Sequence, residues 1–170
     1  MVTVSLVKTL IKGSTMKTFS ALVNEYSEKI AEIMPWDLEE KLESDTPPLL
    51  LDIRETYEFD AMRISGSINV PRGILESACE YDYEETVPEL ASARDREIVV
   101  ICRSGYRSVF GAWIMQLMGF KHVCSLKSGL RGWNDYEQPM INDKGEVDID
   151  DAEEYFTPKL SPEQLHPTSK

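Results

Sequence analysis

The fold class is decided by the stretch Ile98-Val99-Val100-Ile101-Cys102-Arg103-Ser104-Gly105-Tyr106-Arg107-Ser108. Residues 98–101 form a short continuous apolar run, which predicts a strand buried on both faces, as in a parallel sheet. From Tyr106 the apolar residues follow the pattern of a mostly buried helix as far as Met118, and Gly119 is well placed to end it. A buried strand that leads directly into a helix is a unit of parallel α/β sheets.

The same alternation extends to both sides of this stretch. We predict strands at residues 49–54, 67–71 and 122–126, and helices at residues 56–62 and 130–136. Strands that alternate with helices favour a parallel sheet covered by helices on both faces. The chain is therefore predicted to have an α/β fold.

Two segments flank this core. Apolar residues at helical spacing over residues 19–33 predict one amphipathic helix that Thr18 caps and Pro35 ends, and a short helix at residues 36–42 follows it. Residues 143–170 carry eight acidic residues against three lysines, which is typical of a partly disordered tail or a wrap-around arm. We divide the chain into an N-terminal extension with its helix, a central domain, and an acidic tail with prolines, at residues 1–35, 36–140 and 141–170.

Length and composition limit the class of protein. A chain of 170 residues corresponds to about one domain. The net charge of −12 argues against nucleic acid and against an anionic membrane surface as partners. No apolar run approaches the roughly 18 residues that span a bilayer, and no secretory signal pattern is present, so we expect a cytoplasmic protein.

Cysteine and histidine usage argues against a metal site or a disulfide framework. The cysteines Cys79, Cys102 and Cys124 are widely spaced, and the only histidines are His122 and His166. These spacings do not fit the usual zinc-ligand patterns, so we expect no metal and no cofactor. We expect reduced thiols, one of which is available for chemistry.

Cys102 stands where open α/β sheets place their ligands, at the carboxyl end of a parallel strand. The loop N–H groups and the N-terminus of the following helix would face its sulfur and favour negative charge, so we expect a thiolate. Gly105 allows the positive φ that a tight cradle needs. The candidate active-site loop comprises Arg103, Ser104, Gly105, Tyr106, Arg107 and Ser108.

The cysteine loop also lies in a run of basic residues. Residues 98–134 contain no acidic residue and carry Arg103, Arg107, Lys121, Lys127 and Arg131. In a strongly acidic protein, such a positive island would attract an anionic substrate. The alternative is that these bases balance acidic residues elsewhere in the fold.

Four motifs occur in one order along the chain. They are Cys-x-x-Gly-x-Arg at residues 102–107; Leu50-Leu51-Asp52-Ile53-Arg54-Glu55; Phe59 through Arg63-Ile64-Ser65-Gly66-Ser67-Ile68-Asn69-Val70-Pro71; and Gly119-Phe120 through Val123, Leu126, Gly129 and Trp133. Together, over about residues 36–138, they resemble the single-domain rhodaneses, a family of sulfurtransferases. The resemblance implies one rhodanese-like domain with a parallel sheet of about five strands.

Three positions depart from the family pattern. Arg63 stands where histidine is usual, Ser65 where proline is usual, and Ser128 where a first glycine is common. These positions shape the rim of the sheet, so they bear on substrate preference more than on the chemistry.

The resemblance implies double-displacement sulfur transfer with Cys102 as the nucleophile. Its thiolate would take the outer sulfur of an anionic donor and hold it as a persulfide. Thiosulfate is the favoured donor, because Arg103 adds charge beside Cys102. Cyanide, a small thiol or a sulfur-carrier protein would then accept the sulfur. Arg103 and Arg107 would hold the dianionic donor, and the loop N–H groups would stabilise the anionic sulfur.

The other candidate residues receive a structural interpretation. Asp52 ends a strand at the same sheet edge and could support catalysis together with Arg54, but we favour an ion pair that fixes the loop. Cys79 and Cys124 are interpreted as small buried hydrophobic residues.

Two other classes of protein remain as alternatives. A phosphatase or arsenate reductase of the Cys-x5-Arg type needs an arginine six positions after the cysteine, where this chain has Ser108. A non-catalytic rhodanese-like interaction module tends to lose the cysteine, which is intact here. The N-terminal helix and the acidic tail still favour docking to a protein partner.

Overall fold

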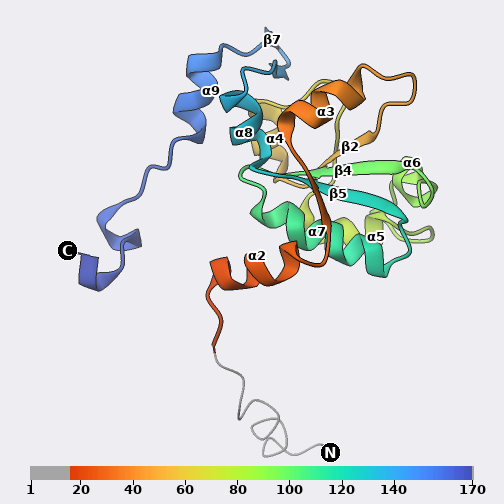
Figure 1. The fold of residues 1–170 in the computed structure, drawn as a ribbon, viewed down its shortest axis with the longest axis horizontal. Coiled ribbons are helices and arrows are strands. Elements are labelled where there is room, and N and C mark those ends of the chain that lie inside the picture. The colour runs from red at the N-terminus through yellow and green to blue at the C-terminus, as the bar shows by residue number, and fades with distance from the viewer. Residues whose placement is uncertain (1–15, 170) are drawn as a thin grey trace, which may run out of the picture.

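A computed structural model describes residues 16–169. Residues 1–15, which open the expected N-terminal extension, lie outside the described residues. The centre of the structure is a five-stranded parallel sheet with the order β1-β5-β4-β2-β3 (Figure 1). Its strands are β1 (Ala31–Ile33), β2 (Leu49–Asp52), β3 (Ile68–Asn69), β4 (Glu97–Ile101) and β5 (His122–Leu126).

Helices cover both faces of this sheet (Figure 1). They are α2 (Phe19–Ser27), α3 (Pro35–Leu42), α4 (Thr56–Ala61), α5 (Leu75–Ala78), α6 (Pro88–Ala91), α7 (Tyr106–Leu117), α8 (Gly129–Asp135) and α9 (Ile149–Phe156). Short 3-10 turns occupy Arg72–Ile74, Pro162–Gln164 and Pro167–Ser169, and a small antiparallel hairpin pairs β6 (Ile141–Asn142) with β7 (Gly145–Glu146). The predicted α/β fold with a parallel sheet of five strands is confirmed.

The alternation of side chains along the central strands creates two cores. Ile98 and Val100 of β4 pack with α5, α6 and α7 on one face, whereas Val99 and Ile101 pack with α3, α8 and α9 on the other. Successive residues of a strand point to opposite faces, so a strand covered on both sides is apolar throughout. This is why residues 98–101 are a continuous apolar run.

The predicted single helix over residues 19–33 is wrong in its second half. Thr18 caps α2 as predicted, accepting a hydrogen bond from the Ala21 N–H at 3.1 Å, but the helix ends at Ser27. Residues 31–33 instead form β1, which pairs in parallel with β5 and buries Ile33. Backbone pairing and burial against the sheet outweigh the weak helical preference of so short a segment.

Aromatic side chains attach α2 to α7. The ring of Tyr26 lies 4.7 Å from that of Trp113 and 5.5 Å from that of Phe110, and Phe19 contacts Tyr106 edge-on at 5.8 Å between centroids. Aromatic pairs at these distances add to the free energy of burial. They hold α2 beside the first turns of α7, next to the loop that follows β4.

The acidic C-terminal segment returns to the domain as a wrap-around arm. After the β6–β7 hairpin, Asp148 caps α9 by accepting a hydrogen bond from the Asp150 N–H at 2.9 Å. Ala152 and Phe156 are buried in the core formed with α8. Residues 157–168 are exposed, and this segment leads away from the domain in Figure 1.

Within residues 16–169, no helix combines the length and the apolar character needed to cross a membrane.

Replacement of Phe156 by alanine tests the docking of the arm. Phe156 is only 2% exposed, so Phe156→Ala should lower the free energy of unfolding by about 3–5 kcal/mol. Leu160, which is 62% exposed, provides the control, and Leu160→Ala should change it by less than about 0.5 kcal/mol. Urea denaturation of both variants measures the difference, and similar losses would show that α9 does not dock through Phe156.

Candidate active site

The loop after β4 forms a cradle around the sulfur of Cys102. The N–H groups of Gly105 and Ser108 donate to Sγ at 3.2 and 3.4 Å, and the Ser108 hydroxyl lies 3.3 Å from it. Gly105 has φ +83°, the left-handed region that glycine adopts without strain. A Cβ there would also lie 2.8 Å from the Ser128 nitrogen. The positive φ predicted for Gly105 is thus confirmed, and the space beside it also excludes a side chain.

A pair of serines completes the cradle. The Ser125 hydroxyl, on β5, donates to the Ser108 hydroxyl oxygen at 2.7 Å, and both residues are buried. Because Ser108 accepts this bond, its own proton is free to point at Sγ. The sulfur thus faces two backbone N–H donors and one O–H donor. Sequence reasoning missed Ser125, although a serine inside an apolar strand is a signal, since a buried hydroxyl needs a partner.

The first turn of α8 holds the outer side of the loop. The N–H groups of Leu130 and Arg131 donate to the carbonyls of Cys102 and Arg103 at 2.9 and 3.0 Å. Gly129, at φ +58°, comes so close that a Cβ would lie 2.4 Å from the Cys102 carbonyl oxygen. Ser128, one of the departures from the family pattern, adopts φ +63°, the conformation that a glycine would take most easily.

Arg107 is bound to an acidic residue that the sequence analysis did not identify. Its two terminal nitrogens donate to the two carboxylate oxygens of Glu58 at 2.8 Å each. Burial, the largest single cause, raises the pKa of Glu58, but the hydrogen bonds and the charge of Arg107, together with the Glu55 N–H and the charge of Arg54, outweigh it, and the pKa lies below its usual value. The same pairing raises the pKa of Arg107. These two hydrogen bonds fix the loop to α4, and direct binding of the donor by Arg107 stays a prediction.

Asp52 and Arg54 form a buried ion pair, which is the structural role favoured in the sequence analysis. Arg54 Nη2 donates to Asp52 Oδ2 at 2.7 Å, and neither residue is exposed. Arg54 also donates to the carbonyl oxygens of Glu58 and Met62 at 3.1 and 2.7 Å. The pair therefore holds the middle and the C-terminal end of α4, the helix that carries Glu58.

Arg103 points toward the C-terminal arm. Its Nη2 donates to the carbonyls of Tyr155 and Phe156, the last two residues of α9, at 3.3 and 2.9 Å. Carbonyl oxygens at a helix C-terminus attract cations but do not cancel their charge. Arg103 remains a cation beside the cysteine, and its expected role toward an anionic donor stays a prediction.

The basic run is only partly a positive island. Arg107 pairs with Glu58, Lys127 lies 3.7 Å from Glu32, and Lys121 pairs with Asp95. Arg103 and Arg131 make no ion pair with any residue in the described part of the chain. Three bases of the run are thus balanced by acidic residues distant in sequence, as the alternative interpretation held. The other two, Arg103 and Arg131, keep part of the positive island.

Two other loop residues reach the surface, whereas the other two thiols lie outside the loop. Ser104 is partly exposed, and Tyr106 is exposed where α7 begins. Burial raises the pKa of Cys79 to about 12 and that of Cys124 to about 11, so both stay protonated thiols near neutral pH. Among residues 16–169, no cluster of three or more metal-ligating side chains occurs.

Comparison with known proteins assigns a family to most of this region. The sequence model of one protein family, described as "Rhodanese-like domain", matches residues 34–136. The chain is 32% identical over 111 residues to the "Putative sulfurtransferase YtwF" of Bacillus subtilis, covering 65% of this chain and 97% of that protein. It is 33% identical over 110 residues to the "Putative sulfur carrier protein YrkF" of the same organism, again over 65% of this chain.

A solved structure from Rhodopseudomonas palustris is similar over a longer part of the chain. It is described as a protein of unknown function and "Possible Tyrosine Phosphatase", and it is 26% identical with a TM-score of 0.65. The match covers 75% of this chain and 97% of that one. Some relatives are longer than the region they share with this chain. The match to YrkF covers only 54% of the length of that protein.

The buried ion pair leads to a stability prediction. Asp52→Asn leaves the Arg54 charge buried without its partner, so the free energy of unfolding should fall by about 3–5 kcal/mol. The exposed Asp95, which pairs with Lys121, provides a matched control, and Asp95→Asn should leave the urea midpoint almost unchanged. Equal midpoints for the two variants would show that the Asp52–Arg54 pair does not support the fold.

The Glu58–Arg107 pair leads to a prediction of pH dependence. A carboxylate whose pKa is lowered by folding stabilises the protein above the unfolded pKa of about 4.3, and this stabilisation is lost as the pH falls through the lower folded value. Urea denaturation should therefore show Glu58→Gln to be less stable than the original protein at pH 7, with the gap closing below about pH 4. Glu43→Gln, at an exposed position, should show no such gap. A gap that stays constant with pH would contradict the pairing.

Proposed function

This chain belongs to the rhodanese-like family, and we propose that it is a sulfurtransferase that carries sulfur as a persulfide on Cys102. The observation that carries the proposal is the cradle of two N–H groups and one hydroxyl around Sγ. Fixed donors of this kind stabilise an anionic sulfur without reorganisation during the reaction. They suit a thiolate before the transfer and again after it.

The reaction proceeds in two displacements. The Cys102 thiolate attacks the outer sulfur of thiosulfate, a new S–S bond forms at Sγ, and the S–S bond of the donor breaks as sulfite leaves with its electron pair. An acceptor then attacks the outer sulfur of the persulfide, and the electron pair of the broken bond returns to Sγ. Arg103, a cation without an acidic partner in the described residues, is the candidate to draw in the dianionic donor.

Cyanide, a small thiol and a sulfur-carrier protein are the proposed acceptors. YrkF, to which this chain is similar, is named as a sulfur carrier, which favours a protein or thiol acceptor of sulfur. The proposed reaction uses no metal and no cofactor, because the thiolate alone is the nucleophile.

Phosphatase chemistry is less well supported, although one similar structure is described as "Possible Tyrosine Phosphatase". Phosphate transfer needs a cation directed at the phosphate oxygens. Position six after the cysteine is Ser108, whose hydroxyl lies against Sγ, and the nearby Arg107 is bound through both terminal nitrogens to Glu58. A purely non-catalytic module has no need of a complete donor cradle around a retained cysteine.

Intact mass measured before and after thiosulfate tests the proposal. The original protein should gain one sulfur atom that a reductant removes, and Cys102→Ser should gain none. Thiosulfate-to-cyanide transfer should fall by about 10³-fold or more in Cys102→Ser. Cys79→Ser and Cys124→Ser serve as controls and should still be loaded, because burial keeps both thiols protonated.

Absence of the added sulfur in a folded protein would contradict the assignment. Hydrolysis of p-nitrophenyl phosphate that depends on Cys102 would favour the phosphatase alternative instead.

A further inference from the structure

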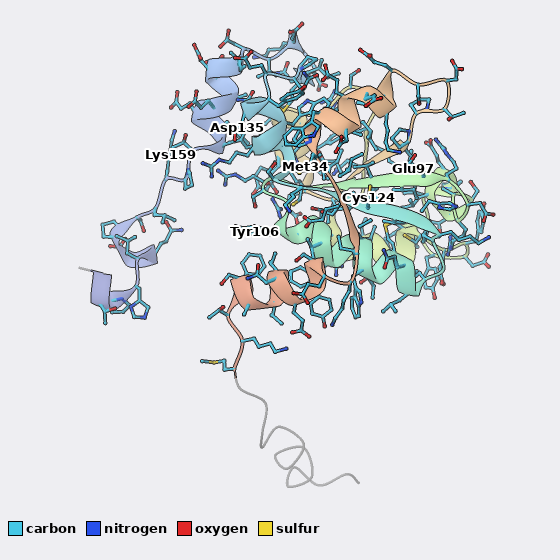
Figure 2. The ribbon with its side chains drawn as sticks, viewed as in Figure 1. Met34, Glu97, Tyr106, Cys124, Asp135 and Lys159 are labelled. Carbon is cyan, nitrogen blue, oxygen red and sulfur yellow. The ribbon has the colours of Figure 1, made fainter. Side chains whose placement is uncertain are left out.

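A cavity of about 490 Å³ lies beside the cysteine loop, between α2 and α8. Figure 2 labels two of its residues, Tyr106 at the start of α7 and Asp135 at the end of α8. The wall from α2 includes Asn24 and Ser27, and the wall from α8 includes Arg131. Because α2 lies outside residues 34–136, this cavity is built partly by a segment that the family model does not include.

The cavity is larger than the small ions of the proposed reaction require. Pockets of roughly 300–1,000 Å³ accommodate organic ligands with many atoms, whereas thiosulfate and cyanide are ions of a few atoms. The volume therefore fits a larger reactant. In a double displacement with thiosulfate as donor, that reactant is the sulfur acceptor.

The charges on the walls indicate the chemistry of this acceptor. Arg131 and Asp135 are exposed and take part in no ion pair with any of residues 16–169. Lys127 and Glu32 also line the cavity, and Lys127 Nζ lies 3.7 Å from Glu32 Oε1. An arginine without an acidic partner offers its fork of N–H donors to a carboxylate. The carboxylate of Asp135 offers a partner to an ammonium group. Separate cationic and anionic groups in one cavity suit a zwitterion better than a simple anion.

The cavity shares its wall with the cradle. Gly105 lines the cavity, and its N–H donates to Sγ of Cys102 at 3.2 Å. On the α8 side, the Arg131 N–H donates to the Arg103 carbonyl at 3.0 Å, so the backbone that carries this cation is fixed to the same loop. A ligand held by Arg131 thus lies against the loop that would carry the persulfide.

We propose that this cavity binds the sulfur acceptor, and that the acceptor is a small thiol bearing both carboxylate and ammonium groups. The inference rests on the proposed persulfide function. The acceptor thiolate attacks the outer sulfur of the Cys102 persulfide, forming a new S–S bond. The S–S bond at Cys102 breaks, its electron pair stays on Sγ, and the transferred sulfur leaves with its proton as a hydropersulfide of the acceptor.

Calorimetry with S-methylglutathione tests the cavity without any sulfur transfer, because this probe carries the charges but has no free thiol. The full chain should bind it, and Arg131→Ala should raise the Kd by roughly tenfold through loss of the forked contact. Arg96→Ala removes an exposed arginine that pairs with Glu89 and serves as the matched control, so it should bind like the original protein. Asn24→Trp, which fills the cavity from α2, should also abolish binding.

Kinetics with thiosulfate-loaded protein tests the role of the cavity in transfer. The kcat/KM for glutathione relative to that for 2-mercaptoethanol, which has no charged groups, should fall by roughly tenfold in Arg131→Ala. An unchanged ratio, or no binding of S-methylglutathione by the original protein, would overturn the inference. If thiosulfate fails to load Cys102, the proposed function fails instead, and the calorimetry still reports separately on the cavity.

Discussion

The cradle depends on the direction in which the peptide groups of the cysteine loop are held. Each peptide has an N–H on one side and a carbonyl on the other, so N–H groups can face Sγ only if the carbonyls turn outward and find partners there. The first turn of α8 supplies those partners through the N–H groups of Leu130 and Arg131. This contact requires Gly129, since a Cβ at that position would lie 2.4 Å from the Cys102 carbonyl oxygen. The donor geometry around the sulfur is thus set by a helix more than twenty residues downstream.

A second support reaches the same loop from β2. The buried Asp52–Arg54 pair fixes α4 by its carbonyls, α4 presents Glu58, and Glu58 holds Arg107 by two hydrogen bonds. Removing charges from water costs free energy, and a buried pair recovers it only when its hydrogen bonds are nearly complete. Both terminal nitrogens of Arg54 donate to carbonyl oxygens of residues 58 and 62, so the pair restricts the position of α4. Through the contact of Glu58 with Arg107, it also restricts the start of α7. Arg107 therefore shapes the candidate active-site loop through its contact with Glu58.

The sequence predicted those features that depend on local pattern. The strand at residues 98–101, the helix from Tyr106 and the glycine at 105 follow from apolar periodicity and backbone conformation, and all are confirmed. Local patterns could not predict which distant segments pair with each other. Ile30 and Ile33 are spaced as on a helix, yet Ile33 belongs to β1 because β5 offers it backbone partners. Glu58 lies 49 residues from Arg107, and only the fold brings the two together.

The pairing of charged residues was the property that the sequence predicted least well. A run of bases without acids looked like one island, but the sheet order brings Glu32 beside Lys127 and α4 beside the loop. Within this basic run, Arg103 and Arg131 are left without acidic partners among the described residues, and the Arg131 N–H donates to the Arg103 carbonyl at 3.0 Å.

The two helices outside the family match, α2 and α9, lie beside the cysteine loop. From the matched region, residues 34–136, come β4, the cradle and α8, and hence the hydrogen-bond donors around the sulfur of Cys102. From outside it, α2 forms one wall of the cavity beside Gly105, and α9 binds Arg103 through its last carbonyls. Both flanking helices are anchored by aromatic side chains: Phe156 of α9 is buried, and Tyr26 of α2 contacts Trp113 edge-on. Because they touch the loop without donating to Sγ, changes in these segments can alter which partners reach Cys102 while leaving its three hydrogen-bond donors in place.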